Sequence, residues 1–267
     1  MALATDYTRH NDALWSLCLN SPNPDPDAVV DQINSARALA RAVVAAIDTL
    51  DDRRLFYGAV VGAAGARLKQ LDYLATDATD HLSHAVDILY DVRARPGASD
   101  DKALLWEAGR RITLAQELTA LGAQDCTATA ELLVTELRRQ DALVQPLAVS
   151  PTQQAALRAI AQGYVTIDRL DGKPLVSRDD IRITISTIRS LEARTLVVRE
   201  GCPQHMLERV RLTTDGCRAL ADTFGRPTSS TPATTRAVQP TPTTAPGRTQ
   251  TTTPIPPPAP THQRHTR

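Results

Sequence analysis

The chain has 267 residues, enough for one or two domains with a sizeable core, and it carries 30 basic and 30 acidic residues. Aromatic residues make up only 3% of the chain while aliphatic residues are plentiful, so we expect a core of closely packed helices. The longest run of apolar residues and glycines, residues 58–66, is too short to cross a membrane, and the first twenty residues lack the pattern of a secretory leader. Because the four cysteines are scattered and form no CxxC pair, we predict a soluble, cytoplasmic protein with no membrane partner.

The balanced total charge hides a polarity along the chain. Residues 1–145 carry 14 basic and 21 acidic residues, residues 146–225 carry 11 and 9, and residues 226–267 carry 5 basic residues and no acidic one. A basic C-terminal part is typical of a protein that faces a polyanion, although composition also drifts along chains that bind none.

Residues 1–145 show the apolar spacing of helices and no run of alternating β-branched residues, which predicts a helical bundle of about five or six helices. The first two helices are expected at residues 5–19 and 27–50, on either side of a segment with three prolines. A third helix is expected to begin at Asp51 and Asp52 and to use Gly58, Gly62 and Gly65 for close packing. Further helices are expected at residues 77–93, 99–121 and 123–140, with a break at the Gly122 region.

Residues 150–177 predict a helix followed by a β-hairpin. Ser150 followed by Pro151 is a helix start, because a hydroxyl can cap the first turn and proline is favoured at the first helical position. Apolar and polar residues then alternate over residues 164–169, Asp171 and Gly172 form a tight-turn pair, and residues 174–177 can return as an edge strand.

The next segment predicts a helix that could read DNA. Over residues 183–194, Ile185, Ile188 and Leu191 point towards a core. The opposite surface carries side chains that commonly contact base edges and phosphates, namely Ser186, Thr187, Arg189 and Ser190. Strands are expected at residues 196–200 and 209–213, and a helix at 215–224 with Thr213 or Thr214 as its cap.

The order of these elements resembles the MarR-like winged helix-turn-helix regulators. The matching residues are Ser186-Thr187-Ile188, the run from Leu191 to Arg199, and the run from Arg211 to Gly216 that contains Leu-Thr-x-x-Gly. The resemblance implies that Ser186, Thr187, Arg189 and Ser190 enter a DNA major groove and that the wing at residues 201–209 lies along the backbone or minor groove. It also implies a homodimer on a palindromic site.

The sequence departs from that family in two places. A hairpin occupies the position of the helix that normally precedes the recognition helix, and Thr195 stands where the family usually has glycine. Because a β-branched residue is strained in the left-handed conformation, we expect this helix to end in a different way. The basic side chains expected to meet phosphates are Arg182, Arg189, Arg199, Arg209 and Arg211.

Weaker patterns suggest metal sites without completing them. His81 and His84 share one predicted helix with three aspartates, which a solvated acidic face also explains, and Cys202, His205 and Cys217 offer three ligands where structural zinc takes four. No nucleotide-binding, metalloprotease or hydrolase motif occurs in the sequence. We therefore predict that the protein is not an enzyme and that it has neither a metal nor a cofactor.

Together these patterns predict a mainly α protein. Its expected parts are an N-terminal helical bundle (residues 1–145), a C-terminal winged helix-turn-helix module (146–225) and a disordered Pro/Thr-rich tail (226–267). The predicted function is a DNA-binding transcriptional regulator that binds double-stranded DNA as a homodimer, with a helical domain for dimerisation or sensing; a small-molecule effector stays open. The alternative is a non-catalytic interaction or assembly protein that uses the winged helix for protein contacts.

Overall fold

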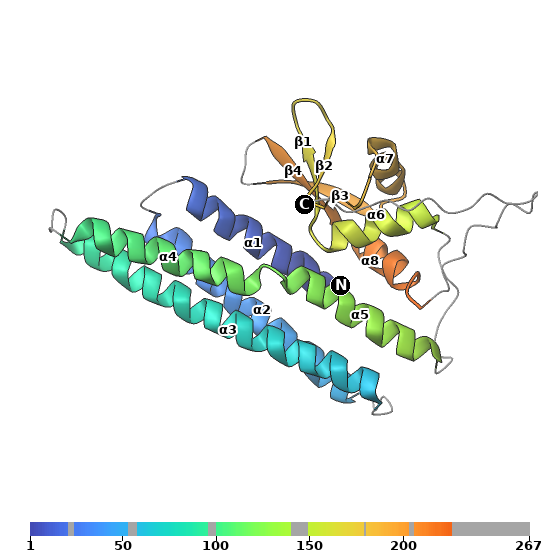
Figure 1. Ribbon diagram of the computed structural model, residues 1–267, viewed down its shortest axis with the longest axis horizontal. Helices are drawn as coiled ribbons and strands as arrows, with labels where there is room; N and C mark the ends of the chain where they lie inside the picture. The colour runs from blue at the N-terminus through green and yellow to red at the C-terminus, as the bar shows by residue number, and fades with distance from the viewer. Residues whose placement is uncertain are drawn as a thin grey trace, which may run out of the picture. The chain divides into compact units, whose positions relative to one another are not determined.

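The computed structural model describes residues 1–20, 24–52, 58–95, 100–139, 149–178, 180–202 and 206–225 (Figure 1). Met1–Arg226 form one compact unit. The predicted joint near residue 145 and the predicted disordered tail lie outside the described residues. Within them the chain is mainly helical with one small antiparallel sheet, as the sequence predicts.

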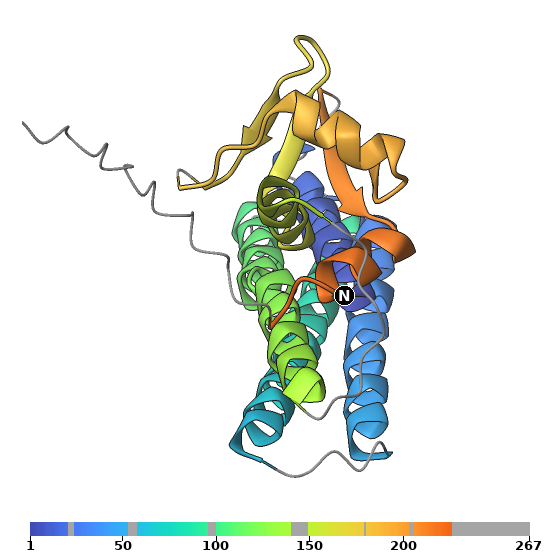
Figure 2. The same ribbon diagram turned by 90° about the vertical axis from the view of Figure 1, so that its right-hand side faces the viewer.

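The first half of the chain forms the predicted helical bundle. Its helices are α1 (Ala2–Asn20), α2 (Pro26–Asp52), α3 (Ala59–Ala94), α4 (Asp101–Thr119) and α5 (Gly122–Arg139). Figures 1 and 2 show these helices lying side by side along a common direction. Two apolar clusters hold them together, one with Leu14, Leu82 and Ile112 at its centre and the other with Tyr7 and Leu71.

The predictions of a third helix that begins at Asp51 and Asp52 and of a separate helix over residues 77–93 are wrong. Asp51 and Asp52 end α2, and α3 runs without interruption from Ala59, with Gly58 in an extended conformation at its N-cap. A glycine inside a helix costs about 0.5–1 kcal/mol. The stripe that α3 buries offsets this cost, because it runs the length of the helix through Val61, Leu68, Leu71, Ala78 and Leu82.

The predicted break at Gly122 is confirmed, and the structure gives its reason. The ring of Tyr7 in α1 packs directly on Gly122, where an added Cβ would lie 2.2 Å from Cδ1 of that ring. The Tyr7 hydroxyl continues across the bundle and donates to the Leu71 carbonyl at 3.2 Å. Only glycine leaves room for this aromatic ring at the junction of α4 and α5.

Residues 149–225, called here the C-terminal module, contain the remaining elements. These are α6 (Pro151–Ala161), β1 (Val165–Asp168), β2 (Pro174–Val176), α7 (Ile185–Ala193), β3 (Val197–Gly201), β4 (Leu207–Leu212) and α8 (Thr214–Ala221). They follow the predicted order. Ser150 caps α6, as predicted, and forms a capping box with Gln153. Of the two threonines predicted as the cap of α8, Thr213 is the one that caps it.

The four strands form one antiparallel sheet in the order β2-β1-β4-β3. One face of the sheet supplies Val165, Ile167 and Val210 to a core shared with α6, α7 and α8. Because side chains alternate along a strand, the opposite face carries Thr166, Arg209 and their neighbours. The loop between β1 and β2 extends beyond the sheet (Figures 1 and 2).

Candidate nucleic-acid interface

Helix α7 stands on a well-packed base. Ile188 and Leu191 are fully buried, and Ile185 packs against the same cluster. The helix begins at Thr184, whose hydroxyl accepts a hydrogen bond from the Thr187 amide at 3.3 Å. These contacts orient the polar side of α7 away from the core.

Hydroxyl groups gather at the start of α7. The Thr184 hydroxyl lies 2.8 Å from the Ser186 hydroxyl and 3.0 Å from that of Thr187. Ser186 is exposed and Thr187 is half-buried. One turn later, Ser190 accepts a hydrogen bond from Gln153 Nε2 at 3.1 Å, so the start of α6 braces the middle of α7.

Two of the predicted phosphate contacts, Arg182 and Arg189, are exposed and form no ion pair with any described residue. Arg194 lies nearby but donates to Gln153 Oε1 at 3.2 Å, and Arg178 forms a bidentate pair with Asp180 at 2.9 Å. Arg189 on α7 and Arg182 in the segment before this helix are therefore exposed and not paired with a described carboxylate.

The other three predicted phosphate contacts are engaged with carboxylates of the chain itself. Arg199 donates to Glu192 at 2.5 and 3.0 Å. Arg209 and Arg211 lie on the outer face of the sheet, with side chains only 14% and 7% exposed. These three arginines are thus paired with carboxylates of the chain, unlike Arg182 and Arg189, and we do not expect them to contact phosphates.

The partner of Arg209 and Arg211 is Asp12 of α1, which the sequence analysis did not single out. The Asp12 carboxylate accepts from Arg209 at 2.5 and 3.1 Å and from Arg211 at 3.0 Å. A third Arg209 nitrogen donates to the Gly163 carbonyl at 2.5 Å. Helix α1 thereby covers the polar face of the sheet with a nearly buried ion cluster.

Glu200 and Arg9 extend this cluster. Glu200 lies 2.6 Å from Arg211 Nε and accepts from Arg9 at 2.6 and 3.2 Å. The Arg9 guanidinium holds the pKa of Glu200 below its usual range, whereas burial lowers the pKa of Arg211. The alternation of Arg209 and Arg211 in a strand predicts that they share a face, but no local signal identifies Asp12 as their partner.

The end of α7 contradicts the expectation for Thr195. Thr195 adopts a left-handed φ of +56°. Its amide donates to the Glu192 carbonyl at 2.8 Å and the Leu196 amide to the Leu191 carbonyl at 3.0 Å, which is the Schellman pattern. The helix therefore ends in the left-handed conformation that glycine usually adopts, although Thr195 has a β-branched side chain.

The glycine of the Leu-Thr-x-x-Gly run has a direct structural role. Gly216, in the first turn of α8, packs on the Leu196 carbonyl, where an added Cβ would come within 1.9 Å of the oxygen. The Thr213 amide donates to that same carbonyl at 3.0 Å. The close contact between α8 and Leu196, which follows the end of α7, thus requires glycine at position 216.

Among the described residues, no group of three or more His, Cys, Asp or Glu side chains could hold a metal ion. His205 lies outside the described residues. No described helix combines the length and apolar character that membrane crossing requires. Comparison of the chain with known protein families, curated proteins and solved structures finds no match.

Proposed function

We propose that the C-terminal module is a DNA-binding unit of the winged helix-turn-helix type, similar to MarR-like regulators, in a cytoplasmic transcriptional regulator that acts as a homodimer. The observation that carries the proposal is the exposed face of α7. Arg189 on this face and Arg182 in the segment before the helix lack carboxylate partners among the described residues, and α7 also carries the hydroxyls of Ser186, Thr187 and Ser190. Arginine and short hydroxyl side chains on one helix face suit phosphates and base edges.

The surrounding elements support this assignment. The β3–β4 hairpin directly follows α7, as a wing follows a recognition helix, and α8 closes the core behind it. The β1–β2 hairpin takes the place of the helix that usually precedes the recognition helix. The hydrogen bonds from Gln153 to Ser190 and Arg194 give α7 a second support from α6.

The ion pairs within the chain reduce the expected dependence of DNA binding on salt. Five phosphate contacts per protomer would weaken binding several hundredfold between about 50 and 200 mM salt, with a logarithmic slope of about −4.5. Two contacts, from Arg182 and Arg189, give a slope of about −2 and a loss of about tenfold. Weak binding by a single protomer is consistent with binding as a dimer.

The test measures binding of the full chain to genomic duplex fragments by fluorescence anisotropy over a range of NaCl concentrations. Arg189→Ala should lower the slope by about one and weaken binding to all duplexes. Arg41→Ala is the matched control, since Arg41 is an exposed helical arginine on α2 with no ion pair among the described residues. Ser186→Ala should alter preference between sequences recovered from the genome rather than the slope. No binding to any duplex at low salt would reject the proposal.

A protein-contact function is the second candidate, and one observation favours it. Leu170 in the β1–β2 loop is 77% exposed and Met206 in the β3–β4 loop is 48% exposed. The two loops touch, because the Arg169 amide donates to the Met206 carbonyl at 2.9 Å. Exposed apolar side chains on adjoining loops suit a protein partner. Loss of a co-purifying protein after Leu170→Ser, together with absence of duplex binding, would favour this alternative.

A further inference from the structure

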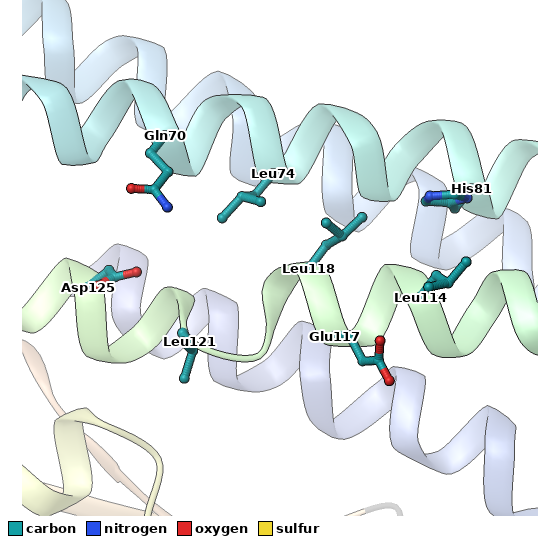
Figure 3. Close-up of a pocket in the computed structure, with 8 residues that line it drawn as sticks. All are labelled: Gln70, Leu74, His81, Leu114, Glu117, Leu118, Leu121 and Asp125. Atoms are coloured by element: carbon teal, nitrogen blue, oxygen red, sulfur yellow. The ribbon is translucent and has the colours of Figure 1, made fainter.

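A groove of about 300 Å³ opens on the helical bundle between α3 and the junction of α4 and α5 (Figure 3). Leucines line it, but Glu117 and Asp125 lie at opposite ends, and the Glu117 carboxylate points away from α3 (Figure 3). Binding sites usually have polar groups that converge on the ligand, so this groove favours no particular class of ligand. The C-terminal module has a better-defined arrangement at Gln153, between α6 and α7.

The side chain of Gln153 connects the start of α6 to α7. Its Oε1 accepts hydrogen bonds from the Ser150 amide at 3.1 Å and from Arg194 Nη1 at 3.2 Å. Its Nε2 donates to Ser190 Oγ at 3.1 Å. The cap of α6 thus holds two positions of α7.

These contacts fix which end of the Gln153 amide faces Ser190. A backbone amide and a guanidinium group can only donate, so the atom that they share must be the carbonyl oxygen of Gln153. The NH₂ group then faces Ser190, and because it only donates, the Ser190 hydroxyl must be the acceptor. The network therefore determines the direction of this hydrogen bond.

The proton of the Ser190 hydroxyl stays available. A serine hydroxyl can donate one hydrogen bond, and no hydrogen bond among the described residues uses the proton of Ser190. Ser190 is exposed and lies one turn after Ser186, on the side of α7 opposite the buried Ile188. The exposed face of α7 thus presents a hydrogen-bond donor whose position Gln153 holds.

The hydroxyl of Ser186 has no such fixed direction. It lies 2.8 Å from the Thr184 hydroxyl, and either oxygen can be the donor. The Thr184 hydroxyl also lies 3.0 Å from that of Thr187. Because the protons of these three hydroxyls can rearrange, Ser186 can face a donor or an acceptor equally well, whereas Gln153 biases Ser190 towards an acceptor.

We propose that Ser190 determines sequence specificity by donating a hydrogen bond to an acceptor on a base edge in the major groove, and that Gln153 is its positioning residue. The acceptors available there are purine N7, guanine O6 and thymine O4. Duplexes that place an amino group of adenine or cytosine opposite Ser190 leave its proton unpaired at a desolvated interface, so they bind more weakly. This inference rests on the proposed function of α7 in DNA binding.

The test selects duplexes from a random library with the full chain and then measures the affinities of single-base variants by fluorescence anisotropy. At one base pair the original chain should discriminate between bases about three- to tenfold, and Ser190→Ala should lose the discrimination at that base pair alone. Gln153→Glu replaces the donor that faces Ser190 with an oxygen. The Ser190 proton then points to position 153, so the hydroxyl can only accept from DNA, and the preferred base at the same base pair should change.

Two controls separate this effect from misfolding and from added charge. Gln153→Glu keeps the capping box, since glutamate serves in that motif as glutamine does, and a thermal melt checks that the variant is folded. Gln154→Glu adds the same charge at the next position of α6 and should keep the base preference of the original chain.

Two results would overturn the inference while DNA binding stands. One is that Ser190→Ala weakens binding to all duplexes equally, as loss of a phosphate contact would, or leaves every base preference intact. The other is that Gln153→Glu keeps the same base preference as Gln154→Glu. Absence of duplex binding by the original chain would instead reject the proposed function, and this inference with it.

Discussion

Replacement of Asp12 by asparagine tests whether α1 holds the sheet of the C-terminal module. The Asp12 carboxylate is 11% exposed and accepts three hydrogen bonds from Arg209 and Arg211. Asparagine keeps the shape of the side chain but removes the negative charge. It also places the NH₂ group of the amide, a hydrogen-bond donor, next to guanidinium groups, which have no acceptor to offer it.

The structure sets the expected loss of stability. Removing one partner of a buried ion pair costs about 3–5 kcal/mol, because the remaining charge is left without compensation. The lower end applies here, since Arg211 keeps Glu200 at 2.6 Å and Arg209 keeps the Gly163 carbonyl at 2.5 Å. We therefore expect Asp12→Asn to lower the free energy of unfolding by about 3 kcal/mol.

Urea unfolding followed by circular dichroism measures this loss. With a denaturant dependence of about 3 kcal/mol/M, the midpoint should fall by about 1 M urea. Asp6→Asn is the control, because its pair with Arg9, at 3.4 Å and about half exposed, should contribute no more than about 1 kcal/mol. The double variant with Arg209→Gln should lose clearly less than the sum of the single variants.

Equal midpoints for Asp12→Asn and Asp6→Asn would refute this reasoning. Such a result would mean that Arg209 and Arg211 are not paired with α1 in solution. They would then return to the set of arginines available for DNA, and the expected salt dependence would rise accordingly.

Two further predictions concern His10 and Thr195. Burial lowers the pKa of His10 from about 6.5 in the unfolded chain to about 4 in the folded protein. Between about pH 6.5 and pH 4 the folded protein therefore binds fewer protons than the unfolded chain. The contribution of His10 to the free energy of unfolding should be complete above about pH 6.5 and should fall by about 2–3 kcal/mol towards pH 4. His10→Gln should remove this part of the pH dependence measured by urea titration. Equal pH dependence of the original chain and the variant would contradict the prediction. Thr195→Gly should raise the free energy of unfolding by about 0.5–1 kcal/mol. The substitution relieves a left-handed strain of about 1–2 kcal/mol in the folded protein, and the greater conformational freedom of glycine in the unfolded chain offsets part of this gain. Thr195→Ala keeps the strain and should show no such gain in thermal melts, whereas a less stable glycine variant would argue against strain.

Local patterns in the sequence determine much of this protein. The 3.6-residue spacing predicts the helical bundle, and Ser150 and Thr213 mark the starts of α6 and α8. Gly172, with a φ of +66°, provides the turn between β1 and β2. These features can be predicted because each depends on residues within a few positions along the chain. The polar face of α7 was predicted for the same reason.

Contacts between distant segments are decided only by the tertiary structure. Asp12 and Arg209 are 197 positions apart, so whether that arginine faces a carboxylate or solvent depends on how α1 docks on the sheet. Tyr7 and Gly122 are likewise far apart in the sequence, and only their contact in the fold shows why the junction of α4 and α5 requires a glycine. The sequence by itself therefore determined most of the elements and their exposed and buried faces, but not the continuity of α3. Tertiary packing decided which charges remain available, because pairing and burial depend on residues brought together from far along the chain.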